Sequence, residues 1–258
     1  VASAAIGEDH PMALVIRNDR VVCLRRLGRL DEALSEAEDV LARHLSDPRW
    51  RETAIAESYD RIAAIHLDAR DYDAAAAAMQ SAIRFGEVAF GPEHPRMADI
   101  LFNYGELLIN QGDLTGAEAN YRRLIELDSK LRGPEHPYVV SERHNLARTV
   151  SLQGRNEEAL GMLEELLEME DRVGLASERM GIATNFEAMR VLAELGRFDE
   201  AIPRGLAQLA AMEAAGQDEL IDQLWVHGKL AYVYGKAGDT EAEARHRALA
   251  GDGGEGEQ

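Results

Sequence analysis

The chain of 258 residues has little of several features that would point to particular classes of protein. It has one cysteine, so it forms no internal disulfide and no thiolate cage for a metal. Aromatic residues make up 5% of it, and basic residues are outnumbered, 28 against 47 acidic. The net charge of −19 disfavours nucleic acid and anionic membranes as partners, because clustered Lys and Arg are what bind phosphate groups.

Long apolar runs and a secretory signal are also missing. No segment approaches the roughly 18 apolar residues that a membrane span needs, and no basic stretch followed by an apolar one opens the chain. We therefore expect a cytoplasmic protein. The chain opens on Val1 and not on Met, which indicates a fragment or a processed chain. Cys23 lies in an apolar, helix-like stretch, which predicts a small buried side chain and not a nucleophile.

Residues that favour helix, chiefly Ala, Leu, Glu and Arg, are abundant, and they are arranged in a repeat of 42 residues. The sequence Gly-Pro-Glu-His-Pro at residues 91–95 recurs at 133–137 and, altered, at 7–11. A glycine has the same period, with Arg70 in its one remaining position: Gly28, Gly112, Gly154, Gly196 and Gly238. An alanine stands five residues later in five of the six repeats: Ala33, Ala75, Ala117, Ala159 and Ala201.

Each repeat is predicted to be two helices with a turn at the glycine, which readily adopts a left-handed conformation. In the third repeat the first helix is expected from Pro95 to about Asn110, and Thr115 is the best candidate to cap the second. Small residues such as Gly105 and Ala117 are expected where the two helices cross. In the sixth repeat Glu243 replaces the alanine, so its second helix is expected one residue out of register.

This pattern resembles the tetratricopeptide repeat. Gly105, Ala117 and Tyr121 stand where that family has its small, small and aromatic positions. Its ordinary repeat has about 34 residues, and the present repeat with its Gly-Pro-Glu-His-Pro linker resembles the longer variant of kinesin light chains. The resemblance implies an all-α fold, a right-handed α-α superhelical solenoid of six helix–turn–helix repeats.

The predicted organisation is one solenoid over residues 1–250, cut from a larger protein. Residues 1–6 are expected to end a preceding helix, and residues 251–258 to form a flexible, acidic, Gly-rich tail. The repeats are expected near residues 7–48, 49–90, 91–132, 133–174, 175–216 and 217–250.

No catalytic motif is found, so we expect no enzymatic activity and no cofactor. Metalloprotease, nucleophile-elbow, P-loop and EF-hand patterns are missing, and the Gly-rich tail matches G-x-G-x-x-G without a strand or helix around it. His10, His94 and His136 stand one or two periods apart and are expected in successive linkers, not around one metal ion.

The resemblance implies that the first helix of each repeat lines a concave groove that binds a partner. The groove positions carried over to this sequence are Phe102, Asn103, Glu106, His144, Asn145, Arg148, Phe186, Arg190, Trp225, Lys229 and Tyr232. Asn103 and Asn145 are equivalent, and paired amides can hold an extended peptide backbone. Further groove positions include Lys236, and the C-terminal half is expected to be basic. The alternative is that these charges are merely solvated and that Trp225 packs between repeats.

The sequence thus predicts a non-catalytic scaffold that docks a protein or peptide segment. A second hypothesis is a regulatory sensor whose groove binds a peptide or inhibitory segment to control an attached kinase or DNA-binding domain, since related bacterial arrays are joined to such domains. A third is self-association through the ends of the repeat array.

Overall fold

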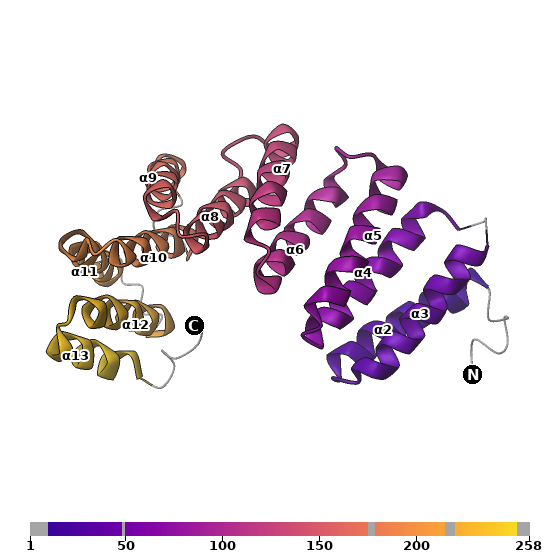
Figure 1. Cartoon of the computed structure of the whole chain (residues 1–258), viewed down its shortest axis with the longest axis horizontal. Helices are drawn as coiled ribbons and strands as arrows, with labels where there is room; N and C mark the ends of the chain where they lie inside the picture. Colours follow the sequence, from indigo (N-terminus) through magenta and orange to yellow (C-terminus); the bar gives the residue numbers. More distant parts are fainter. Residues whose placement is uncertain (1–9, 48–49, 175–178, 215–219, 252–258) are drawn as a thin grey trace. The chain divides into compact units, whose positions relative to one another are not determined.

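The computed structural model describes residues 10–47, 50–174, 179–214 and 220–251, and within these ranges it holds twelve α-helices and no strand (Figure 1). The predicted preceding helix at residues 1–6 and most of the predicted tail lie outside the described residues. The helices are α2 (Pro11–Arg26), α3 (Leu30–Ser46), α4 (Glu52–Asp68), α5 (Tyr72–Phe90), α6 (Pro95–Gln111), α7 (Leu114–Arg132), α8 (Pro137–Leu152), α9 (Asn156–Val173), α10 (Arg179–Glu194), α11 (Phe198–Ala214), α12 (Leu220–Ala237) and α13 (Thr240–Ala250).

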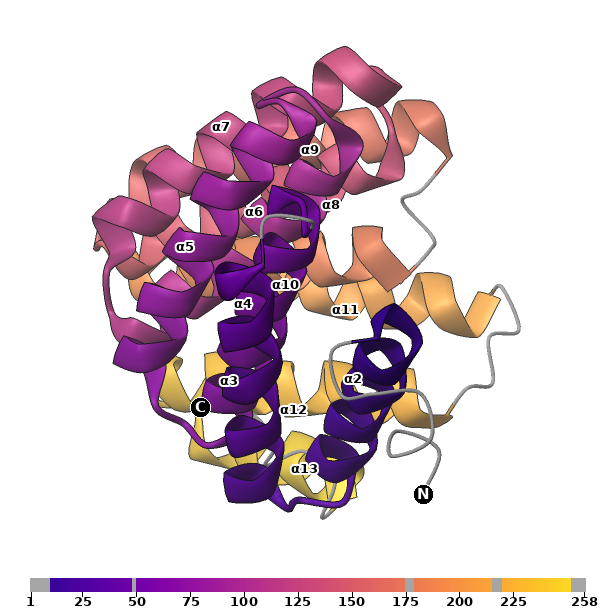
Figure 2. The same ribbon diagram turned by 90° about the vertical axis from the view of Figure 1, so that its right-hand side faces the viewer.

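The chain divides into two compact units, Val1–Leu131 (unit 1) and Arg132–Gln258 (unit 2). Unit 1 contains the helix pairs α2/α3, α4/α5 and α6/α7, and unit 2 contains α8/α9, α10/α11 and α12/α13. Each unit therefore holds three repeats, and the division falls where the third predicted repeat ends. Figures 1 and 2 show the antiparallel pairs stacked in chain order within each unit, as a helical-repeat fold requires.

The turns between paired helices follow the periodic glycine. Gly28, Gly112, Gly154, Gly196 and Gly238 all have positive φ, between 71° and 84°. Arg70 fills the same turn with φ 59° and is the one positive-φ residue other than glycine among the described residues. A left-handed backbone is strained for any residue with a Cβ. Arg70 adopts it because the turn between the two helices requires it, and not because its side chain favours it.

The second helices begin earlier than the sequence predicts. α7 starts at Leu114, and the carboxylate of Asp113 accepts a hydrogen bond from the N–H of Gly116 at 2.9 Å, so Asp113 and not Thr115 caps it. Asp71 caps α5 through Ala74 in the same way, at 3.1 Å. The residue directly after the turn is not helical, as at Asp71 with φ −87° and ψ 77°, so it can cap the helix, and Thr115 lies inside the helix.

The histidines of the linkers cap the first helices. Nδ1 of His10, His94 and His136 accepts a hydrogen bond from the N–H two residues on, at 3.2 Å in each case. Proline follows each of them as the first helical residue, where its missing N–H costs nothing. The His-Pro pair therefore marks where a first helix begins, and it recurs in register with the 42-residue repeat.

Small residues lie where the paired helices cross. The five periodic alanines are fully buried. A Cβ built on Gly105 would lie 2.6 Å from Cζ of Tyr121. In the sixth repeat the expected slip of register is wrong, because α13 starts at the position equivalent to the start of α5. Gly235 of α12 instead makes room for Glu243, whose carboxylate would lie 3.0 Å from a Cβ there.

Each unit has its own apolar core. In unit 1 a cluster joins Val21 and Leu24 of α2 through Met79 of α5 to Leu107 of α6. In unit 2 a cluster runs from Leu160 and Leu163 of α9 through Met189 of α10 to Leu230 of α12. Cys23, predicted to be buried, is exposed on α2, because it lies on the helix face opposite Val21 and Leu24.

Candidate functional site

The first helices of unit 2 carry eight of the eleven predicted groove residues. α10 contacts both α8 and α12 and lies between them in Figures 1 and 2. We define the first-helix face of unit 2 as ten residues of these three helices that are at least partly exposed. They are His144, Asn145 and Arg148 of α8, Glu187, Arg190 and Glu194 of α10, and Trp225, Lys229, Tyr232 and Lys236 of α12.

An aromatic contact joins α10 and α12. Trp225 is 37% exposed, and the ring of Phe186 meets it edge to face with 4.5 Å between centroids. The ammonium of Lys229 lies over the indole, 5.4 Å from its centroid. Phe186, predicted as a surface position, is only 3% exposed and belongs to the core. Phe186 packs against Trp225 from the core and is therefore not part of the candidate surface.

An ion pair lies at the centre of the face. Arg190 is 2.6 Å from the carboxylate of Glu187 and also donates to the hydroxyl of Ser151 on α8 at 2.7 Å. Burial raises the pKa of Glu187, but the hydrogen bond and charge of Arg190, with the charges of His144 and Arg148, outweigh it and lower that pKa. Glu187 therefore stays ionised, and Arg190 ties α8 to α10.

A second group of polar side chains joins α10 and α12. The Tyr232 hydroxyl donates to Glu194, and Lys236 lies 3.1 Å from the same carboxylate and over the Tyr232 ring. The hydrogen bond from Tyr232, with that from Lys236, lowers the pKa of Glu194. Burial and Glu194 raise the pKa of Tyr232. The prediction that this end of the groove is basic is therefore wrong for Arg190 and Lys236, because each of them pairs with a neighbouring carboxylate.

His144 connects the face to the interior. Its Nδ1 lies 3.3 Å from the Thr184 hydroxyl, which donates to the carboxylate of Glu170 at 2.8 Å. Glu170 is fully buried, and burial raises its pKa. Asn145 and Arg148, on the same helix, are half-buried.

The other three predicted residues lie on α6 in unit 1. Phe102 is half-buried, Asn103 is exposed, and Glu106 accepts a hydrogen bond from the Tyr121 hydroxyl at 2.6 Å. Asn103 and Asn145 belong to different units, so their joint hold on a peptide backbone stays a prediction.

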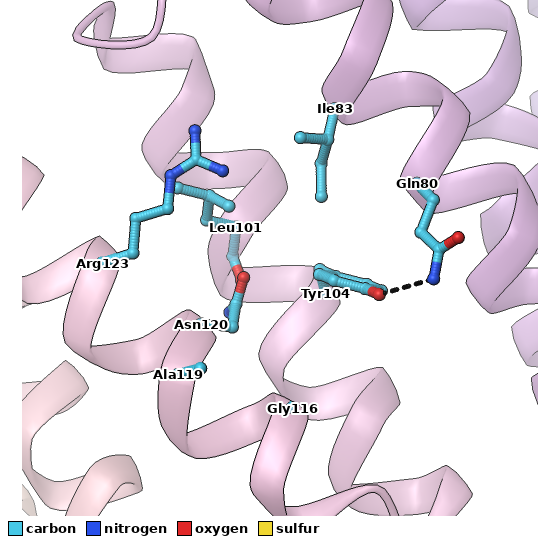
Figure 3. A pocket seen from close by; sticks show the side chains of 8 residues that line it. All are labelled: Gln80, Ile83, Leu101, Tyr104, Gly116, Ala119, Asn120 and Arg123. Carbon is cyan, nitrogen blue, oxygen red and sulfur yellow. Dashed lines mark hydrogen bonds between the residues drawn. The ribbon is translucent and has the colours of Figure 1, made fainter.

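Unit 1 also has a cavity that the sequence did not indicate. It has a volume of about 380 Å³ and lies between α5 and α7 over α6 (Figure 3). Its lining consists of Gln80, Ile83, Leu101, Tyr104, Gly116, Ala119, Asn120 and Arg123. Gln80 donates to the Tyr104 hydroxyl at 3.0 Å, the dashed line in Figure 3, and Asn120 donates to the Leu101 carbonyl at 2.6 Å.

A more polar cavity of about 580 Å³ shares Gln80 and reaches the α6–α7 turn at Gln111 and Asp113. None of the predicted groove residues lines either cavity. Gly116 stands where the first, fourth and fifth repeats have Glu32, Glu158 and Glu200. A Cβ at Gly116 would lie 2.3 Å from the carboxylate of Asp113, so this glycine accommodates the cap of α7 and does not mark the cavity.

In the part of the chain that the structure describes, no three His, Cys, Asp or Glu side chains are grouped so that they could hold a metal ion. No helix among those residues has the length and apolar character to cross a membrane.

Residues 52–128 and 96–170 match the family model described as tetratricopeptide repeat. Among solved structures, a kinesin-light-chain-type protein with nearly identical TPR-like repeats from Podosopora anserina is similar, with TM-score 0.70 and 20% identity over 81% of this chain and 99% of that one. BtubC (BKLC) from P. vanneervenii has TM-score 0.64 and 18% identity over 86% and 89%. The apo form of RapI has TM-score 0.67 and 10% identity over 96% and 65%. No curated protein matches significantly.

Proposed function

Because this chain is a tetratricopeptide-repeat protein with kinesin-light-chain-like repeats, we propose that it is a non-catalytic scaffold that docks a protein or peptide segment on the first-helix face of unit 2. The fold is that of protein-interaction scaffolds. We choose this face because two partly exposed aromatic rings lie on α12, those of Trp225 and Tyr232. Each ring has a lysine ammonium over it. Aromatic residues of this kind are the usual energetic anchors of interfaces.

The chemistry of this face defines the segment that would fit. An apolar side chain of the segment packs on the Trp225 indole, which Phe186 holds in place. A carboxylate beside it pairs with Lys229, whose ammonium lies at the same ring. We assign to the half-buried Asn145 of α8 a hydrogen bond from its amide to the segment's backbone. Arg190 acts differently from the prediction: it holds α8 and α10 together through Ser151 and Glu187.

A short-peptide display library tests the proposal. The full chain is expected to enrich peptides with an apolar residue next to an acidic one, and Trp225→Ala and Lys229→Ala are expected to weaken their binding at least tenfold. Leu206→Ala is the matched control, since it truncates an exposed apolar side chain on a second helix of the same unit. Enrichment that survives the Trp225 and Lys229 changes, or that Leu206→Ala abolishes, would contradict the proposal.

The sensor hypothesis uses the same face and adds an attached kinase or DNA-binding domain. A solved STAND protein from Pyrococcus horikoshii with a tetratricopeptide repeat sensor shares the fold, with TM-score 0.69 and 12% identity, and the present chain spans 36% of it. A peptide selected on this chain should then change the activity of such a domain. A scaffold alone predicts capture without that change.

A further inference from the structure

Helices α5 and α7 of unit 1 have an open trough between them, with α6 as its floor. We define the α5–α7 trough as the two cavities described above, which share Gln80 and have volumes of about 380 and 580 Å³. Ligand sites in proteins have volumes of roughly 300–1,000 Å³. The rim of the trough is exposed at Gln80, Ala119 and Arg123 and, toward the α6–α7 turn, at Gln111 and Asp113. The trough is therefore open to solvent along its length, as a site for a chain segment would be.

Asn120 offers the trough a hydrogen-bond acceptor that the chain does not use. Its side chain lines the trough but is only 8% exposed, and its Nδ2 donates to the Leu101 carbonyl at 2.6 Å. Its Oδ1 accepts no hydrogen bond from any described residue, and it is not sealed off from solvent, so a donor in the trough can reach it. The other repeats have no amide at this position, but Glu36, Ala78, Met162, Arg204 and His246. A largely buried acceptor without a donor is costly, so a ligand that donates to it is favoured.

Tyr104 supplies a matching donor in the same cavity. Its hydroxyl accepts a hydrogen bond from Gln80 at 3.0 Å and donates to no described residue. In Figure 3, Asn120 and Tyr104 lie between Arg123 on one side and Gln80 on the other. One acceptor and one donor on the floor of the trough complement a peptide unit, which has one N–H and one C=O.

The end of the trough at the α6–α7 turn carries two carboxylates and no cation. Asp73 accepts a hydrogen bond from Gln111 at 2.6 Å, and Asp113 caps α7. Neither carboxylate forms an ion pair with a described residue, and no Lys, Arg or His lines this cavity. Each still has lone pairs to offer a donor, since an ionised carboxylate has about four. At the other end Arg123 pairs with Glu87 of α5, so the two ends differ in charge.

We propose that the α5–α7 trough binds an extended, basic peptide segment of a partner. One peptide unit of the segment hydrogen-bonds Oδ1 of Asn120 and the hydroxyl of Tyr104, and a Lys or Arg side chain reaches the carboxylates of Asp73 and Asp113. This trough belongs to the second helices of unit 1, whereas the docking face proposed above belongs to the first helices of unit 2. The two surfaces select segments of opposite charge, so a segment bound to one does not compete for the other.

Disulfide tethering to the full chain tests the proposal, because it detects weak ligands of a chosen surface. Ala119→Cys places a thiol at the rim of the trough, and Cys23→Ala removes the exposed native thiol. Six residues of α7, about 9 Å, separate Ala119 from Asp113, and an extended peptide spans that distance in roughly three residues. The probes are therefore acetylated and amidated Cys-Ala-Ala-Arg-Ala and Ala-Arg-Ala-Ala-Cys, one for each chain direction. The same peptides with Glu in place of Arg are the comparison.

In a thiol–disulfide buffer, at least one Arg peptide should be captured about tenfold more than its Glu counterpart, as intact-protein mass spectrometry measures. Asp73→Asn with Asp113→Asn should reduce this preference to about twofold or less, since Asn keeps the cap of α7 but not the charge. Asp199→Asn with Asp239→Asn is the matched control. It removes the same charge at the equivalent positions of unit 2, where Asp239 caps α13, and should leave the preference unchanged.

Two further variants test the floor of the trough. Tyr104→Phe and Asn120→Leu should each lower the capture of the Arg peptide about threefold or more, because the peptide loses a hydrogen bond. Tyr104→Phe keeps the ring and removes only the hydroxyl. Asn120→Leu also loses the bond to the Leu101 carbonyl, so circular dichroism is needed to show that its helices are intact.

Four results would overturn the proposal. Equal capture of the Arg and Glu peptides would exclude a basic segment. A preference lost equally in the Asp199 and Asp239 control would belong to the net charge of the chain and not to the trough. Capture that neither Tyr104→Phe nor Asn120→Leu weakens would show that the floor holds no peptide backbone. Capture of cystamine, which has an amine but no peptide unit, as strongly as the Arg peptides would make the ligand a small amine.

Discussion

At the scale of single residues, Gly105 marks a close approach between paired helices, where α6 and α7 cross. Tyr121 is fully buried against this glycine and donates its hydroxyl to Glu106 on the same first helix. The absence of a Cβ is therefore what allows the Tyr121 ring to lie across α6. After two atoms of the Tyr121 ring, the next nearest atom is Nδ2 of Asn120, whose hydrogen bond ties α7 to the Leu101 carbonyl.

Gly105→Ala should lower the free energy of unfolding by about 1–3 kcal/mol, because the new methyl group would overlap the Tyr121 ring. Urea denaturation measures this. Gly161→Ala in α9 is the matched control, since no heavy atom lies within 4 Å of a Cβ there. That change should stabilise the protein by about 0.5–1 kcal/mol. Equal effects of the two changes would mean that Gly105 is not at a close crossing.

Arg70→Gly should raise the free energy of unfolding by up to about 1 kcal/mol. Arg70 adopts a left-handed backbone in a turn where the other five repeats have glycine. Removing its Cβ relieves this strain, although glycine loses more entropy on folding. A shift in the urea midpoint at constant slope would measure it. A loss of stability on this change would show that Arg70 makes a contact worth more than its strain.

At the scale of helices, the first-helix face of unit 2 is held by side chains that reach from one first helix to the next. Arg190 joins α10 to α8 through Ser151, and Glu194 joins α10 to Tyr232 and Lys236 of α12. Polar residues that look like free binding groups in the sequence are therefore partly used within the fold. On the proposed docking face, these contacts leave chiefly Trp225, Lys229 and Asn145 to meet a partner.

Arg190→Ala should lower the free energy of unfolding by about 1–3 kcal/mol, because the largely buried Glu187 carboxylate loses the donor that keeps it ionised. Thermal denaturation measures the loss. Arg197→Ala should change little, since its pair with Glu200 has the same spacing but lies in solvent. If the two variants are equally stable, the Arg190 pair contributes no more than a surface ion pair.

The α12–α13 contact should weaken in mild acid. Nδ1 of His227 and Nδ1 of His246 lie 2.9 Å apart, and Tyr234 stacks on His246. Burial, and the nearby charges of His227 and Arg245, lower the pKa of His246 below its ordinary 6.5. The unfolded chain therefore takes up a proton that the folded one resists. The contribution is fully present above pH 6.5 and is lost as the pH falls through the lowered folded-state pKa.

Urea denaturation at several pH values between neutral and mildly acidic checks this. The wild type should lose more stability in acid than His246→Phe, which keeps an aromatic ring beside Tyr234 but does not titrate. The comparison with the variant is needed because burial raises the pKa values of Asp60 and Glu170, which act in the opposite direction. Identical pH dependence of the two proteins would contradict the prediction.

At the scale of the whole molecule, stability is divided between two units with separate apolar cores. In a repeat protein each repeat is stabilised mainly by its neighbours, so damage remains local. In Gly105→Ala, amide hydrogen exchange should accelerate in α4–α7 and remain unchanged in α10–α13. Equal acceleration in both units would show that the chain unfolds as one cooperative body.

Much of the fold could be predicted because the repeat is local. The α6 helix predicted from Pro95 to about Asn110 is observed from Pro95 to Gln111, and the periodic glycines and alanines have the expected roles. The predicted starts of the helices after the turns were too late, since capping depends on which residue is the last with a non-helical backbone. The candidate site was predicted less completely: Phe186 has groove spacing but is buried, because the α12 helix packs over it.

By itself, the sequence determined the period, the turn positions and the family, because each depends on residues near one another in the chain. Only the tertiary structure decided which charges are paired, that Cys23 and its neighbours on α2 are exposed, and where unit 1 has cavities. The partners that join neighbouring first helices, such as Ser151 and Arg190 or Glu194 and Tyr232, stand about one repeat apart in the sequence. Whether such residues meet depends on how helices stack, which the pattern within one repeat does not contain.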